Sequence, residues 1–160
     1  MKGANRVTRR LMVSVLALFV IGIGQSLALG KKPADEVLGL RLGMNEGAAR
    51  KRLSKMATMQ PEEGRKKQQV WILRHNSTHS YLITRFKNHQ LVFVTAVVHP
   101  QARVRYANLG AIEEAATGND GQNYTYKWRV AARGTRPGYF VVARGSNADF
   151  LTSYSLYISP

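Results

Sequence analysis

The chain has 160 residues, of which 24 are Lys or Arg and 9 are Asp or Glu, so its formal net charge is +15 at pH 7. A length of this order fits one or two small domains, and 44% hydrophobic residues are typical of a chain that folds. Cysteine is absent from the sequence, which excludes a disulfide framework, a cysteine nucleophile, a thiolate metal site and a lipidated cysteine within it.

Residues 1–28 have the three-part pattern of a secretory signal peptide. Basic residues within the first ten positions precede a mainly apolar run over residues 11–24, and small residues stand at Ser26 and Ala28. The alternative is an uncleaved membrane anchor, but a spanning helix needs about 20 apolar residues. We therefore expect cleavage near Ala28 and a periplasmic or secreted protein with no transmembrane span in the mature chain. The lack of cysteine favours a bacterial periplasm.

The mature chain is predicted to begin with a polar linker over residues 29–36, followed by a single αβ domain over residues 37–160. Asn45 is expected to cap a helix, because its side chain can accept a hydrogen bond from a backbone N–H of the first turn. Apolar residues recur behind it at the spacing of one helical face. These residues are Ala49, Leu53, Met56 and Ala57.

Two sets of strands are predicted after this helix. The first set follows a charged loop over residues 58–69 and covers residues 70–73, 81–86 and 91–98. The second set follows a weak helix over residues 106–116 and a turn over residues 118–121. It covers residues 124–131, 139–143 and 150–158. No helix separates the strands within a set, which favours antiparallel hairpins over parallel crossovers.

This order predicts an α+β fold with two layers, in which helices pack on one face of an antiparallel sheet. The domain would consist of two degenerate αβββ units, the first over residues 37–100 and the second over residues 101–160. The clustered aromatic side chains of the second half are expected mainly in the core, although those beside Arg129 and Arg144 have the alternative of stacking on bases or sugars.

Residues 38–45, Leu-Gly-Leu-Arg-Leu-Gly-Met-Asn, run into Ala49 and Leu53. This segment resembles the start of the SmpA/OmlA-like, beta-lactamase-inhibitor-protein-like module of the bacterial envelope. The resemblance extends at most from Gly39 to Val98, and it implies a two-layer αβ fold that binds other envelope proteins rather than a catalyst. Outer-membrane members of the SmpA/OmlA group are lipoproteins, and this chain departs from them because it has no cysteine.

The candidate catalytic and metal-binding residues lack partners at suitable spacing. His75 and His79 flank a predicted turn, and no acidic residue lies between Glu63 and Glu113 to complete a metal site. Other candidates are Thr152, Ser153 and Ser155, and the carboxylates of Glu113, Glu114 and Asp120. None has the accompanying groups that nucleophilic or general acid–base catalysis requires. The sequence therefore predicts no enzyme, no metal and no cofactor.

Two dense basic runs are the candidate binding residues. They are Arg50, Lys51, Arg52 and Lys55 in the first run, and Arg65, Lys66 and Lys67 in the second. One hypothesis is a periplasmic module that binds an envelope protein through a sheet surface or the basic helix. The alternative is an electrostatic binder of anionic envelope lipids or polymers through these runs, and a third reading is a solvated helix face and loop. Nucleic acid is not expected for an exported protein.

Overall fold

The structure is a computed structural model that describes residues 31–61 and 68–158. The predicted signal peptide and the candidate binding residues Arg65, Lys66 and Lys67 lie outside the described residues. Within the described ranges the elements are α1 (Glu46–Met56), β1 (Ala57–Gln60), β2 (Gln69–Leu73), β3 (His79–Lys87), β4 (Gln90–Val98), η1 (Pro100–Ala102), η2 (Tyr106–Asn108), η3 (Ile112–Glu114), β5 (Ala116–Asn119), β6 (Tyr124–Val130), β7 (Tyr139–Gly145) and β8 (Ser153–Ile158), where η denotes a 3₁₀ helix.

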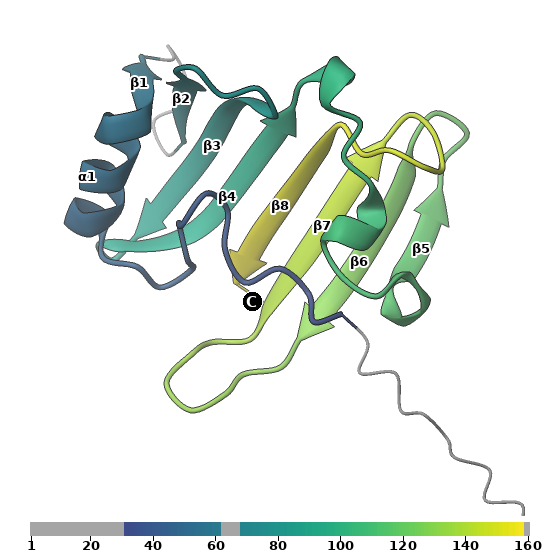
Figure 1. Ribbon diagram of the computed structural model, residues 1–160. Coiled ribbons are helices and arrows are strands. Elements are labelled where there is room, and N and C mark those ends of the chain that lie inside the picture. The colour runs from purple at the N-terminus through teal and green to yellow at the C-terminus, as the bar shows by residue number, and fades with distance from the viewer. Residues whose placement is uncertain (1–30, 62–67, 159–160) are drawn as a thin grey trace, which may run out of the picture.

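All eight strands belong to one antiparallel sheet with the order β1-β2-β3-β4-β8-β7-β6-β5 (Figure 1). Each half of the chain forms a four-stranded meander. The last strands of the two meanders, β4 and β8, pair with one another and join the halves into a continuous sheet. The first and fifth strands therefore lie at the two edges.

The prediction of a two-layer α+β fold with packed helices is wrong, because the protein is predominantly β. The part of the chain that the structure describes has a single α-helix, which lies beside the β1 edge of the sheet (Figure 1). The predicted helix over residues 106–116 is replaced by the short 3₁₀ helices η2 and η3. Strands β1 and β5 stand where the sequence predicts a loop and a turn.

The predicted second helix is absent because backbone groups of Ala111, which the helix would need, form hydrogen bonds with other parts of the chain, including the Trp128 side chain. The Trp128 Nε1 donates a hydrogen bond of 2.6 Å to the Ala111 carbonyl, and the Ala111 N–H donates to the Lys31 carbonyl. An α-helix would need these groups for its own ladder. Gly110 allows the close approach, because a Cβ at this position would lie 2.9 Å from the Trp128 Nε1.

The first helix begins as the sequence predicts. The Asn45 side chain accepts a hydrogen bond of 2.9 Å from the Gly47 N–H and so caps α1. Gly43, two residues earlier, has a φ of 80°, a backbone conformation that favours glycine. Ala49 and Leu53 are buried, and the Glu46 N–H donates to the His89 carbonyl in the β3–β4 turn. The helix is thereby fixed to the first meander at its N-terminus.

The registers of the two meanders are related by a half-turn about an axis through the Thr95–Ser155 pair, at the centre of the β4–β8 ladder. This operation exchanges β4 with β8, β3 with β7, β2 with β6 and β1 with β5, and it preserves the strand order and directions. Trp71, which pairs with Leu82, then falls on Trp128, which pairs with Val141. Both tryptophans are buried on the same face of the sheet.

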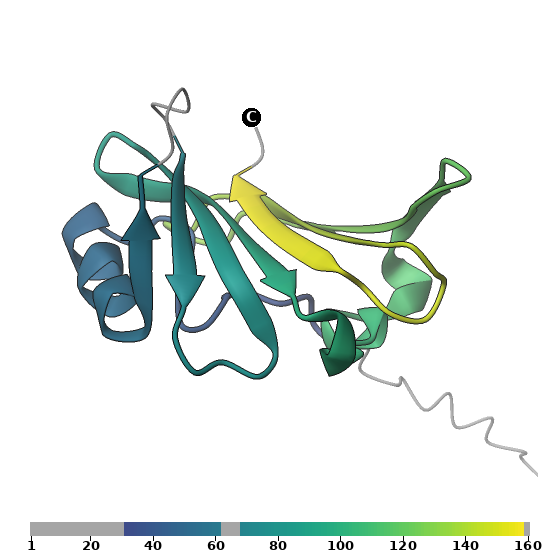
Figure 2. The same cartoon turned by 90° about the horizontal axis from the view of Figure 1, so that it is seen from above.

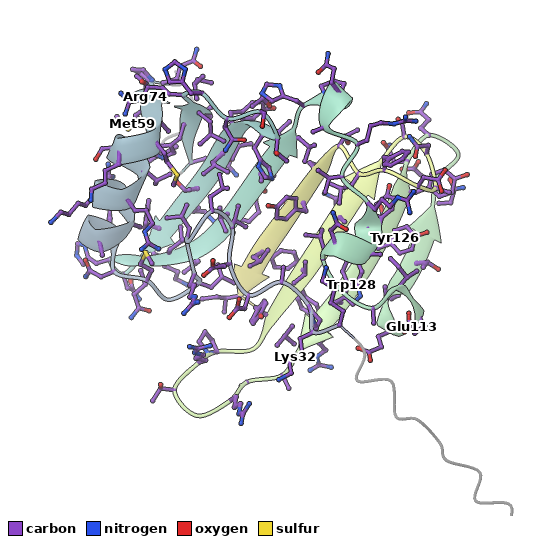
Figure 3. All side chains as sticks on the ribbon, in the orientation of Figure 1. Lys32, Met59, Arg74, Glu113, Tyr126 and Trp128 are labelled. Atoms are coloured by element: carbon purple, nitrogen blue, oxygen red, sulfur yellow. The ribbon has the colours of Figure 1, made fainter. Side chains whose placement is uncertain are left out.

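Among residues 31–61 and 68–158, helices and loops cover one face of the sheet and leave the other face uncovered. The covered face carries α1, the 3₁₀ helices and the segment from residue 31 to residue 45 (Figures 1 and 2). Trp128 and Tyr126 project from β6 toward this side (Figure 3). The segment expected as a linker, residues 29–36, contacts this face where it is described, since the Ala34 N–H donates to the Leu109 carbonyl at 2.7 Å.

Replacing Gly110 by Ala should lower the free energy of unfolding by about 1–3 kcal/mol, the usual cost of forcing extra volume into a packed site. The added Cβ would press on the rigid Trp128 ring. Gly118→Ala is the matched control, because a Cβ there meets nothing within 4 Å. Urea denaturation of both variants measures the difference. Equal stabilities would show that the Gly110–Trp128 contact does not constrain the fold.

Candidate functional site

We call the uncovered side of the sheet the open face. Its central row runs across six strands, because residues directly paired in an antiparallel sheet point to the same side. This row is Val70–Ile83–Thr95–Ser155–Val142–Lys127. The strand alternation places the buried Leu82 and Thr84 on the other side of β3, as the sequence predicts.

The middle of the open face is hollow. Thr95, Val142 and Ser155 are buried although none of the described helices lies over them. Larger side chains from β3, β4, β7 and β8, among them Phe93 and Tyr157, stand around these residues. The resulting hollow has a volume of about 400 Å³, and Arg85 and Arg144 are among the residues that line it. Its floor is a hydroxyl pair, Thr95 Oγ1 to Ser155 Oγ, at 2.7 Å.

A row rich in aromatic side chains borders this hollow, formed by the cross-strand neighbours Arg85, Phe93, Tyr157, Phe140 and Arg129. The Arg85 guanidinium lies 5.3 Å from the centre of the Phe93 ring, and the rings of Phe140 and Tyr157 lie 5.5 Å apart. All three rings are partly exposed. The row presents apolar surface with a cation at each end, a combination common in protein interfaces.

The open face is strongly electropositive. None of the eight described strands contains Asp or Glu. Four cations that project from the open face are Arg85, Lys127, Arg129 and Arg144. Within residues 31–61 and 68–158, none of these four forms an ion pair. The face therefore attracts carboxylates or other anions.

The candidate binding residues on α1 have different surroundings. Arg50 donates two hydrogen bonds to the Glu46 carboxylate, at 2.9 and 2.8 Å, and Arg52 donates to the Gly39 carbonyl. Lys51 and Lys55 are exposed on the helix. Arg50 thus pairs within the helix, and Arg52 connects the helix to the segment that precedes it. The exposed cations of the described surface are spread over helix and sheet.

The histidines are not brought together as a metal site. His79 is buried on the covered face, where its Nε2 lies 3.0 Å from the Tyr154 hydroxyl, while His89 lies 3.6 Å from Glu46. No group of three His, Asp or Glu side chains suited to a metal ion occurs among the residues that the structure describes. Burial lowers the pKa of His79 below 6.5 and raises the pKa of Tyr154 to about 12.

The other polar candidates also separate. Ser155 belongs to the floor of the open face and Ser153 to its rim, whereas Glu113 and Glu114 are exposed in η3 on the covered side. Of the aromatic residues predicted for the core, Trp128 and Tyr154 are buried there, but Phe140 and Tyr157 lie on the open face. The sequence shows which side chains share a strand side, but it does not show which side is left uncovered.

The chain was compared with protein-family models, curated proteins and solved structures, and none of them matches it. The similarity to the SmpA/OmlA-like module therefore stays a prediction from residues 38–45. Across residues 31–61 and 68–158, no helix is both long enough and apolar enough to span a bilayer.

The stability of the protein should fall as the pH decreases below about 6.5, the ordinary pKa of histidine. Burial lowers the pKa of His79 in the folded state, so the unfolded chain binds more protons in this range. The contribution of a neutral His79 is present above pH 6.5 and is lost as the pH falls toward the lowered pKa. Thermal unfolding between pH 7.5 and about 4.5 measures this slope.

A His79→Gln variant should have a flatter pH profile in this range than the parent, since glutamine does not titrate. His75→Gln, at an exposed position, is the matched control and should keep the parental profile. Parallel profiles for the parent and His79→Gln would contradict the assignment of this pH dependence to His79.

Proposed function

We propose that this protein is a non-enzymatic binding module of the bacterial cell envelope that holds a protein partner on its open face. Export rests on the signal peptide predicted over residues 1–28. Binding of a protein agrees with what the SmpA/OmlA-like resemblance implies.

The observation that carries the proposal is the composition of the uncovered sheet face. Half-buried rings of Phe93, Phe140 and Tyr157 lie beside arginines that form no ion pair with the other described residues, around a preformed hollow. Aromatic and arginine side chains are the residues most enriched where proteins bind one another. A face of this kind gives a partner both apolar anchors and directional charged contacts.

Two features favour a protein over an anionic lipid surface. The open face has a hollow at its centre, so a flat bilayer would contact the rim of the hollow and leave the Thr95–Ser155 floor untouched, whereas a protruding protein segment can reach it. In addition, Arg50 and Arg52 are engaged by Glu46 and by the Gly39 carbonyl rather than pointing freely to a headgroup.

The test is a crosslinking pulldown from envelope extract with the full chain, at low and at high salt. The double variant Arg85→Gln, Arg144→Gln removes two cations at the hollow, and Lys51→Gln, Lys55→Gln removes two exposed cations from α1. The open-face variant should retain a given partner several-fold less than the parent, since exposed charge pairs contribute about 0.2–1 kcal/mol each. The helix variant should retain it like the parent.

A partner held mainly through apolar anchors should survive high salt in the parent chain, because screening acts on the charges. Thermal unfolding verifies that both variants fold. Loss of capture in the helix variant alone would contradict the open face as the site. Capture of lipid or glycolipid only, lost at high salt, would replace the proposal with an electrostatic surface binder.

A further inference from the structure

The half-turn that relates the two meanders also relates positions on the open face. It places Arg85 on Arg144 and Tyr81 on Phe140, so the third strands of the two halves carry similar chemistry at these equivalent positions. Their cross-strand neighbours follow from the register. Tyr81 pairs with Ile72 on β2, and Phe140 pairs with Arg129 on β6.

The second strands of the two halves, β2 and β6, differ sharply in the chemistry of their open-face residues. Val70 on β2 is equivalent to Lys127 on β6, and Ile72 is equivalent to Arg129. Ile72 is 42% exposed, one of the few large apolar side chains of the described residues that is so open to solvent. The open face is therefore polarised, with apolar surface over β2 and positive charge over β6.

Core packing does not account for this difference. These four side chains project from the open side of the sheet, while their strand neighbours Trp71 and Trp128 supply the buried contacts of β2 and β6. Lys127 Nζ lies 4.0 Å from the centre of the Phe140 ring, which holds the ammonium group over the face. An exposed apolar end and an exposed cationic end on one surface fit a ligand with the complementary polarity.

We infer that the open face binds a protein segment that is acidic at one end and apolar at the other, with its acidic end over β6 and its apolar end over β2. This rests on the proposed function and specifies the partner. Five strand spacings separate β2 from β6, which is about 24 Å. An extended segment of about seven residues covers this length.

A second copy of the chain does not supply this segment. The chain has 24 Lys or Arg residues against 9 Asp or Glu, and its described strands contain no carboxylate at all. Two copies brought together through their open faces would repel one another at β6. Charge complementarity therefore points to a different and acidic protein.

The probe is a fluorescein-labelled synthetic peptide of about nine residues, long enough for the span, with glutamates at one end, isoleucine and valine at the other, and serine and threonine between. Fluorescence anisotropy with the full chain measures its affinity at low and at high salt. Lys127→Gln, Arg129→Gln should weaken binding about fivefold at low salt and little at high salt, since the lost contacts are screened charges. Val70→Thr, Ile72→Thr should weaken it by a similar factor at both salt concentrations.

Orientation is measured by nuclear magnetic resonance with a spin label on either end of the peptide. A label at the acidic end should broaden the amide signals of Lys127 and Arg129, and a label at the apolar end those of Val70 and Ile72. Reversed broadening, or the same broadening from both ends, would overturn the inferred polarity. It would leave the proposed function intact if the Arg85→Gln, Arg144→Gln variant still loses its captured protein.

Three further outcomes would also refute the inference. The first is equal affinity for a peptide with glutamine in place of glutamate, and the second is no binding of any peptide while capture through the open face persists. The third is binding to vesicles that contain phosphatidylglycerol in preference to the peptide. If this third result coincides with unchanged protein capture by the Arg85→Gln, Arg144→Gln variant, the proposed function fails as well.

Discussion

The pairing of β4 with β8 is the constraint on which both faces of the molecule depend. Residues 93–97 pair with residues 153–157, although the two segments lie far apart in the chain. Among the described strands, this ladder is the one that joins the two meanders edge to edge. On the covered side it brings Val94 and Leu156 into one core. On the open side it makes the hollow, which neither meander contains alone. Such a long-range ladder costs loop-closure entropy before it adds contacts, and we expect it to form late in folding.

The β4–β8 junction has two small polar side chains at its centre, and each satisfies the other. Thr95 and Ser155 are nearly covered, yet each hydroxyl satisfies the other at 2.7 Å, so neither is left without a partner. Their size keeps the centre of the open face low, while the larger residues Phe93 and Tyr157 stand beside it. The depth of the hollow thus follows from the difference in side-chain volume along the β4–β8 ladder.

Local patterns allowed part of this structure to be predicted from the sequence. The Asn45 cap and the alternation of β3 depend on neighbours in the chain, and both predictions are confirmed. The second helix and the α+β class were wrong, because a tertiary hydrogen bond from Trp128 to Ala111 overrides the helical tendency of that segment. Strands β1 and β5 have only four residues each at the sheet edges, and they lack a clear apolar alternation. The sequence suggests a sheet surface as one possible binding surface, but it does not show which face is left open, because that depends on where the covering elements pack.

Comparing positions related by the internal half-turn shows which residues are constrained by core packing and which are not. Trp71 and Trp128 fill equivalent positions in one core, where a change of volume is costly. Their strand neighbours on the open side meet no such requirement, and there the two halves carry opposite chemistry. In a sheet with one buried face, every second residue of a strand points away from the core, so these residues can change without a loss of core packing. In this protein those alternate residues form a continuous surface across six strands, and the freedom from packing is what allows the chemistry of that surface to differ between the two halves.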